Sequence, residues 1–246
     1  MAGNTRKPGT SVVGRVVDLL GAFDEHHRHL PLTSIARRSG LPLSTTHRLV
    51  GELVARGVLA RDGSDYVIGR QLWSIGLLAP VQTSLREAAS PFLHDLFAAS
   101  LAAVHLAVRD DDVVLYLESL SGRASVETVH SIGSRLPMHA TGVGKVLLAH
   151  APEEVRRRVL ADLTPVTEHT ITDPRTLLAQ LARIRRDGWA STEQEMSAGA
   201  FSVAVPVRRR DEVVAAVGVV VENLERDRGR AVAALQVAAQ GISRTL

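Results

Sequence analysis

The most constraining feature of this sequence is a fixed order of short patterns in the first third of the chain. Two helical patterns, at 30–42 and 43–56, are separated at Gly40. Glycine tolerates the left-handed conformation in which many helices end. A pair of strand patterns at 57–69 follows directly, with its turn at 62–65. This order predicts a helix-turn-helix followed by a β-hairpin wing.

The second helical pattern has two different faces. One face is an apolar stripe formed by Thr46, Leu49, Val50, Leu53 and Val54. The other face begins with polar residues, Ser44, Thr45, His47 and Arg48. The second helix of a helix-turn-helix places its N-terminal side chains against base edges in the major groove. We therefore expect these four residues, together with Arg61 beside the wing turn, to contact DNA. An ordinary helical hairpin with a solvated polar face is the alternative.

Length and charge indicate that this module is one of two domains. The chain has 246 residues, which exceeds the usual length of a single domain. Residues 1–75 hold ten Lys and Arg against six Asp and Glu, whereas the remainder holds 19 against 20. A basic excess in the N-terminal part suits contact with phosphates.

Another amphipathic helix pattern, at 12–23, follows Thr10 and Ser11, which can cap it.

Absent features exclude several classes of protein. The chain has no cysteine, which excludes disulfides, thiolate metal sites and cysteine nucleophiles. Residues 1–10 lack the apolar run of a signal peptide, and no apolar run of about 18 residues occurs elsewhere. We expect a cytoplasmic protein that does not associate with membranes. His26, His27 and His29 lack a partner at a metal-binding spacing, so we expect a solvated loop there.

The rest of the chain mixes helical and strand patterns. We expect a helix at 84–100 that Pro91 interrupts, followed by a hairpin of strands 104–109 and 113–117. Further strands are expected at 125–130, 189–193, 201–207 and 213–221. Further helices are expected at 140–150, 153–161, 174–187 and 226–245. These patterns predict an α+β fold with a mostly antiparallel sheet and helices packed to one side.

A connecting helix is expected at 71–83, between the two halves. It contains the apolar residues Trp73, Ile75, Leu77 and Leu78. We expect this apolar face to pack on a partner chain.

Short motifs along nearly the whole chain resemble those of the isocitrate-lyase-regulator (IclR) family of transcription factors. In the first third they are SIARRSGLP at 34–42, STTHRL at 44–49 and YVIG at 66–69. Farther on they are LPMHATGVGK at 136–145, IRRDGWA at 184–190 and SVAVPV at 202–207. The sequence departs from the family at Leu43, where a basic residue is common, so one phosphate contact is expected to be absent.

The resemblance implies three parts: a winged helix-turn-helix DNA-binding domain at 10–72, a linker helix at 73–86 and a GAF-like effector-binding domain at 87–246. It implies a ligand-responsive regulator that represses or activates transcription. Its expected partners are double-stranded operator DNA, a small organic acid effector and further copies of the chain, as a homodimer or a dimer of dimers (homotetramer).

The resemblance also implies an effector pocket formed by Met138, Gly142, Val143, Thr192, Ser202, Gly218 and Val220. Backbone N–H groups around Gly142 would receive a carboxylate. In family members that bind small polar acids, the positions of Gly218 and Val220 are often serines, and that of Thr192 is often acidic. Because polar partners are fewer here, we expect an aromatic or aliphatic acid rather than a two- or three-carbon oxoacid.

A small-molecule-binding enzyme of unknown reaction type is the alternative function, but no catalytic motif is complete. The Gly-x-Gly-Lys run at 142–145 is no P-loop, because His139 and Val146 stand where a glycine and a hydroxyl residue are needed. Glu193 and Glu195 lie on one side of a predicted strand without a reacting partner, so we expect a solvated strand end. Neither a nucleophile elbow nor a zinc-protease motif occurs. We expect no enzyme and no cofactor.

Overall fold

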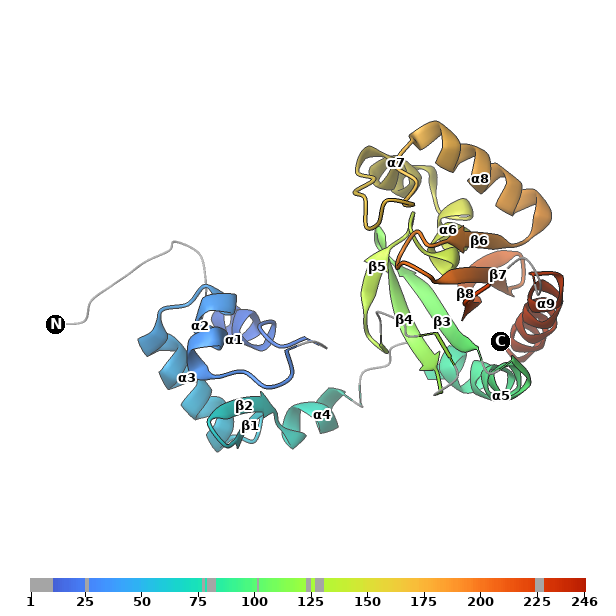
Figure 1. Cartoon of the computed structure of the whole chain (residues 1–246). Coiled ribbons are helices and arrows are strands. Elements are labelled where there is room, and N and C mark those ends of the chain that lie inside the picture. The colour runs from blue at the N-terminus through green and yellow to red at the C-terminus, as the bar shows by residue number, and fades with distance from the viewer. Residues whose placement is uncertain are drawn as a thin grey trace. The chain divides into compact units, whose positions relative to one another are not determined.

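The computed structural model describes residues 11–24, 27–76, 78, 83–100, 102–122, 125–126, 131–223 and 228–246. The chain divides into two compact units, Met1–Val81 and Gln82–Leu246, and both are drawn in Figure 1. Among the described residues, no helix combines the length and apolar character needed to span a membrane.

The first unit is a helix-turn-helix followed by a hairpin, which confirms the predicted winged fold. Its described elements are α1 (Val12–Leu20), α2 (Leu32–Ser39), α3 (Leu43–Ala55), β1 (Leu59–Asp62), β2 (Asp65–Ile68) and α4 (Arg70–Gly76). The strands β1 and β2 pair antiparallel, with Leu59 opposite Ile68. Part of the predicted connecting helix, at 77 and 79–82, lies outside the described residues.

Local chemistry explains where these helices begin and end. The Ser11 hydroxyl accepts a hydrogen bond of 3.0 Å from the Gly14 N–H and so caps α1. The helix α2 ends at Gly40, whose φ of 67° is left-handed. Thr46 is fully buried in α3, and its hydroxyl donates to the Pro42 carbonyl at 3.1 Å. The polar group in the apolar stripe is therefore satisfied.

The second unit is built on a six-stranded antiparallel sheet with the order β5-β4-β3-β8-β7-β6. Its strands are β3 (Ala103–Asp110), β4 (Val113–Leu120), β5 (Arg135–Pro137), β6 (Ala190–Glu193), β7 (Phe201–Arg209) and β8 (Glu212–Val221). The central pair joins β3 to β8, with Ala103 opposite Val220. The predicted strand at 125–130 lies outside the described residues except for 125–126, which belong to no strand. The sequence patterns did not predict β5.

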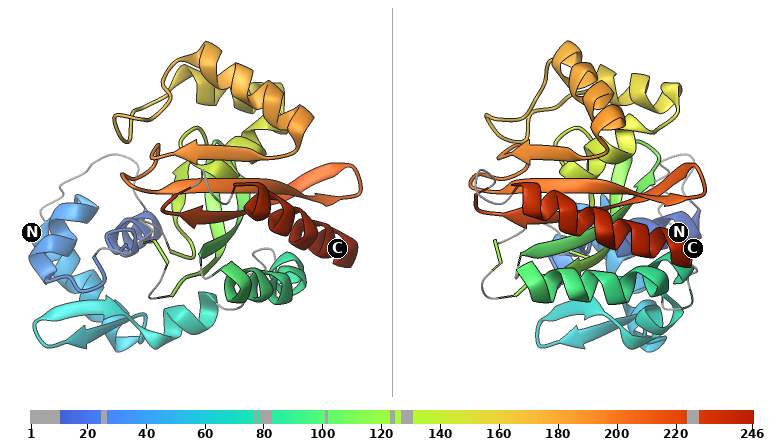
Figure 2. Two further views of the ribbon diagram at one scale, coloured as in Figure 1. Left: turned by 45° about the vertical axis from the view of Figure 1, so that its right-hand side comes forward. Right: turned by 90° about the vertical axis from the view of Figure 1, so that its right-hand side faces the viewer.

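Helices cover both faces of this sheet, so the expectation that they pack to one side is wrong. The helices are α5 (Thr83–Ser100), α6 (Gly142–Ala149), α7 (Glu153–Ala161), α8 (Pro174–Asp187) and α9 (Arg228–Thr245). Side by side, α5 and α9 cover one face, as Figure 2 shows, while α6 and the helices beyond it cover the other. Strand alternation produces this, because Leu106 points to α5 and α9 whereas its neighbour Ala107 belongs to the core around α6.

Pro91 does not interrupt α5, contrary to the expectation from sequence. The helix continues from Thr83 to Ser100 with Pro91 inside it and exposed. A proline removes one backbone hydrogen bond from a helix, but water can satisfy the freed carbonyl on an exposed face. The opposite face buries Leu85, Ala89 and Leu93 against the sheet, and this packing holds the helix together across the proline.

Candidate functional site

The first candidate surface is the outer face of α3. Ser44, His47 and Arg48 are exposed there, while Thr45 is half-buried. No residue caps the start of α3 with a side chain, because the N-cap is Pro42, so N–H groups of the first turn are open to an anion. Within the described part of the chain, no acidic side chain pairs with Arg48. The surface thus offers donors and a positive charge.

The wing adds another cation. Arg61 is exposed on β1, and its guanidinium lies 5.9 Å from the centre of the Tyr66 ring on β2. The two residues are cross-strand neighbours in the hairpin. Stacking on an aromatic face restricts where the guanidinium points, so Arg61 is held at the hairpin while its charge stays accessible.

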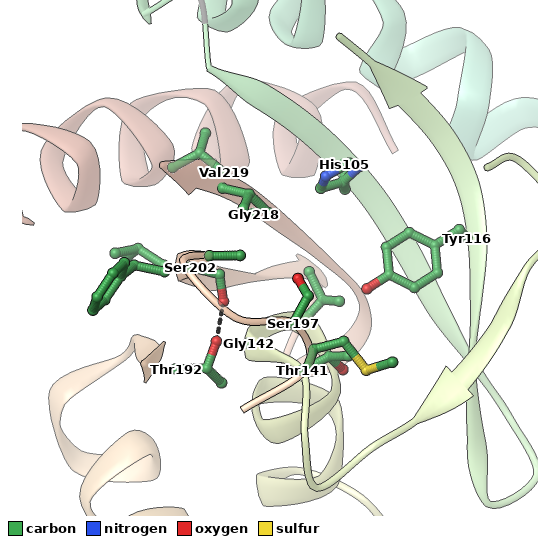
Figure 3. A pocket seen from close by; sticks show the side chains of 15 residues that line it. His105, Tyr116, Thr141, Gly142, Thr192, Ser197, Ser202, Gly218 and Val219 are labelled. Carbon is green, nitrogen blue, oxygen red and sulfur yellow. Dashed lines mark hydrogen bonds between the residues drawn. The ribbon is translucent and has the colours of Figure 1, made fainter. Parts of the chain in front are cut away.

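The second candidate site is a pocket between the sheet and the start of α6 (Figure 3). It is lined by His105, Tyr116, Thr141, Gly142, Val143, Thr192, Met196, Ser197, Ala200, Phe201, Ser202, Val203, Gly218, Val219 and Val220. Its volume is about 40 Å³, which is small beside the roughly 300–1,000 Å³ of pockets for drug-sized ligands.

The floor of the pocket depends on a close approach between α6 and β7. The Thr141 hydroxyl caps α6 by accepting from the Gly144 N–H at 3.1 Å. A Cβ atom on Gly142 would lie 2.5 Å from the Ser202 hydroxyl oxygen, so a larger residue there would require the Ser202 side chain to move. Ser202 stands opposite Thr192 in the pairing of β6 with β7, and their hydroxyl oxygens are 2.5 Å apart. One of these two hydroxyls therefore donates to the other.

Two ring side chains form the polar end of the pocket, and the sequence analysis missed both. His105 on β3 and Tyr116 on β4 are buried and meet edge to face, with ring centres 5.6 Å apart. Burial raises the pKa of Tyr116, and a hydrogen bond with Thr141 opposes this rise only in part. The phenol is therefore protonated at neutral pH and able to donate. The available signal was His105 itself, a polar residue within the otherwise apolar run 102–108.

Of the seven residues predicted for the effector pocket, the structure brings six together in this lining: Gly142, Val143, Thr192, Ser202, Gly218 and Val220. Met138 is not among the lining residues, because it is fully buried in the core around α6. Beyond His105 and Tyr116, the missed residues include Met196 and Ser197, from the segment that leads from β6 to β7, and Phe201, the first residue of β7.

The expectation of a solvated strand end is wrong for Glu195. The strand β6 ends at Glu193, and Gln194 has a φ of 57° that turns the chain. Glu195 consequently points inward, is 4% exposed and accepts a hydrogen bond from Lys145 at 2.5 Å. Strand alternation could not predict this, because the turn at Gln194 breaks it. Within the described residues, no group of three or more His, Asp or Glu side chains could hold a metal ion.

Two family models match the chain. One, described as the IclR helix-turn-helix domain, matches residues 12–63. The other, described as the C-terminal domain of the bacterial transcriptional regulator IclR, matches residues 79–244. Together they span both compact units.

Individual relatives agree with these matches. The glycerol operon regulatory protein of Streptomyces coelicolor is 32% identical over 240 residues, which cover 94% of each chain. The Pca regulon regulatory protein of Pseudomonas putida is 30% identical over 198 residues, 79% of this chain and 68% of that one. Such relatives are transcriptional regulators and not enzymes.

A solved structure resembles the whole chain. It is an IclR homolog from Microbacterium hydrocarbonoxydans in complex with 4-hydroxybenzoate. Its sequence is 35% identical, the TM-score is 0.90, and the match covers 96% of this chain and 99% of that one.

Proposed function

This chain belongs to the IclR family of bacterial transcriptional regulators, and we propose that it binds double-stranded operator DNA through α3 and the β1–β2 wing. The exposed polar face at the start of α3 carries this proposal. The Arg48 guanidinium can fork onto a guanine, and Ser44 and Thr45 can donate to phosphates. Arg61 would add a phosphate contact from the wing.

Footprinting upstream of the gene for this protein, with gel-shift titration of the protected segment, tests the DNA proposal. We expect a protected palindromic segment. The affinity of the protein for this DNA should fall modestly as salt rises, because each winged helix-turn-helix (the reading head) carries few cations. Binding that ignores salt between about 50 mM and 200 mM, or the absence of any protected segment, would contradict the proposal.

We further propose that two copies pair through α4. Trp73 and Ile75 are 61% and 51% exposed on this short helix, and Ile68 beside it is 42% exposed. An apolar surface of this kind is unfavourable in water, and a palindromic site requires a two-fold symmetric reader. A second copy of the chain meets both requirements. Sedimentation of Trp73→Glu should show monomers where the original chain shows dimers or larger assemblies.

For the effector we propose an aromatic or aliphatic carboxylic acid. The first N–H groups of a helix lack partners within it, and Gly142 and Val143, which begin α6, line the pocket. A carboxylate fits there. Val143, Val220 and Phe201 offer apolar surface for the remainder of the ligand, and the homolog that binds 4-hydroxybenzoate supports this class. Because the cavity is small, a ring requires part of the lining to move.

Thermal-shift measurements test the effector class. A ligand that binds only the folded protein stabilises it by about 2.7 kcal/mol at a hundred times its dissociation constant. We expect stabilisation by 4-hydroxybenzoate, benzoate or hexanoate. Stabilisation by pyruvate or glyoxylate, with none by the larger acids, would overturn the effector class and leave the DNA proposal intact.

The effector would act by linkage between the two ligands. A small molecule that prefers one conformation of the sensing unit shifts the spacing of the two reading heads in the dimer. By reciprocity, operator DNA changes the affinity for the acid by the same factor. The proposal places this activity in the cytoplasm, with the chromosome.

A further inference from the structure

The most unusual group in the second unit is a fully buried ammonium. Lys145 has no exposed surface, although it carries a charged side chain. Its Nζ donates to both carboxylate oxygens of Glu195, at 2.5 and 2.7 Å, and to the Gln180 side-chain oxygen at 2.8 Å. An ammonium has three protons, so these three acceptor oxygens, from two residues, satisfy it completely.

Glu195 belongs to the segment 194–200, which forms one wall of the pocket through Met196, Ser197 and Ala200. The segment closes on itself, because the Gln194 N–H donates to the Ala200 carbonyl at 2.9 Å. It is also held from outside. The Thr167 hydroxyl donates to the Gln194 carbonyl at 2.8 Å, and the Thr170 hydroxyl donates to the Glu195 carbonyl at 2.7 Å. Glu195 supplies the only side chain of the described segment that carries a charge.

Lys145 itself lies behind another wall of the pocket. It lies in the first turn of α6, and the first two residues of this helix, Gly142 and Val143, line the pocket. One turn of helix rises only about 5.4 Å. The ion pair therefore connects two walls of the pocket at a short distance behind them.

A contribution to overall stability is a poor explanation for this pair. Burial lowers the pKa of Lys145 and raises the pKa of Glu195, although the charge of each partner opposes both changes. These directions mean that desolvation offsets the attraction between the charges. Replacing such a pair with neutral groups often leaves stability unchanged, whereas removing one partner is costly. The geometry of the pair matters more here than its energy.

We propose that Lys145 is a positioning residue of the effector pocket: its ion pair with Glu195 holds segment 194–200 against α6 and so sets the width of the pocket. The part of this inference that concerns ligands rests on the proposed effector site, while the part that concerns the segment does not. Lys145 touches no ligand in this scheme and acts through Glu195. An aromatic ligand enters when segment 194–200 moves outward while the ion pair between Glu195 and Lys145 stays in place.

Hydrogen exchange of the ligand-free chain tests the positioning. The variant Lys145→Met/Glu195→Gln removes both charges without leaving one buried alone. We expect its melting temperature to stay within a few degrees of the original chain, while amide exchange at 194–200 rises at least tenfold. The control is Arg158→Met/Asp112→Asn, which removes a surface ion pair of 2.7 Å and should leave this segment unchanged. Unchanged exchange at 194–200 in the first variant overturns the proposal.

A titration with 4-hydroxybenzoate separates a positioning role from a structural one. We expect the double variant to bind this acid at least tenfold more weakly although its stability is retained, and the control to bind it as the original chain does. Affinity equal to that of the original chain overturns the proposal. If the original chain does not bind the acid, the effector class is wrong, and the exchange measurement decides the role of Lys145. If the double variant fails to fold, Lys145→Gln/Glu195→Gln, which also removes both charges and keeps hydrogen-bonding groups at both positions, enters both measurements.

Discussion

The helices α3 and α6 both begin beside a proposed binding site, yet they use their residues in opposite ways. In α3 only Thr46, Leu49, Val50 and Leu53 are buried, and the polar face is open. In α6 every residue from Gly142 to Ala149 is buried. The proposed recognition surface of α3 is therefore separate from its packed face, whereas in α6 the buried residue Val143 also lines the pocket. Substitutions in the two helices should have different consequences.

The largest effect is expected for Gly144→Ala in α6. A Cβ atom there would lie 2.4 Å from the Met138 carbonyl oxygen and 2.4 Å from the Thr141 hydroxyl oxygen, so the helix or its neighbours must move. We expect a loss of about 3 kcal/mol in the free energy of unfolding of the second unit, the upper part of the range for overpacked cores. Denaturant unfolding followed by Trp189 fluorescence, in a Trp73→Phe background, measures it.

Gly229→Ala is the matched control for Gly144→Ala, because a Cβ atom on Gly229 meets nothing within 4 Å. It should change stability far less. If Gly144→Ala changes the free energy of unfolding as little as Gly229→Ala does, then α6 is not packed as tightly as its burial indicates.

The next effect concerns α3. Arg48→Ala should weaken operator binding by about 1 to 3 kcal/mol, because a forked contact to a base is lost. The free energy of unfolding should change by less than about 0.5 kcal/mol, since the side chain is exposed. Gel-shift titration and denaturant unfolding of the same preparation provide the two numbers. Arg157→Ala, an exposed arginine of α7, controls for net charge and should bind DNA normally. Equal affinity for operator DNA in the original chain, Arg48→Ala and Arg157→Ala would contradict a role of the exposed face of α3 in recognition.

A smaller effect, of opposite sign to that in α6, is expected for Gly51→Ala. Gly51 is exposed in the middle of α3, and a Cβ atom there meets nothing within 4 Å. Alanine should stabilise the first unit by roughly 0.5–1 kcal/mol through its better helix propensity. Thermal unfolding followed by Trp73 fluorescence, in a Trp189→Phe background, measures the gain. Destabilisation would mean that α3 is more tightly packed than its exposed face indicates.

The smallest effect is a pH dependence of the second unit. Burial lowers the pKa of His139, and the nearby Lys145 acts in the same direction, while a hydrogen bond to the Thr164 carbonyl and the charge of Asp162 oppose it. The unfolded chain therefore takes up a proton below about pH 6.5 that the folded chain resists. The stability that His139 contributes is present above this pH and is lost as the pH falls through its lower folded pKa. Melting temperatures at pH 7.5 and 5.5 should differ more for the original chain than for His139→Gln.

The sequence alone predicted most elements of both units, because their residues follow simple periodic rules. The stripe of Leu49, Val50 and Leu53 has helical spacing, and Val104, Leu106 and Val108 have the alternate spacing of residues on one face of a strand. Gly40 and Gly188 end helices in the left-handed conformation. Such local signals need no knowledge of distant partners.

The remaining features depend on contacts between distant residues. Pro91 stays helical because the opposite face of α5 packs on the sheet, and β5 exists because it pairs with β4. Glu195 turns inward to a lysine fifty positions earlier in the chain. His105 meets Tyr116 only after β3 and β4 have paired. The sequence carries no local pattern for any of these four arrangements.

The pairing of β3 with β8 has a consequence for how the protein is made. The centre of the sheet joins residue 103 to residue 220, whereas the wing joins residue 59 to residue 68. Contacts between distant residues form slowly, and a ribosome releases N-terminal domains first, at about 5–20 residues per second. We expect the first unit to fold while the second is still being translated. Every new molecule then passes through an interval in which its first unit is folded and its second unit is still incomplete.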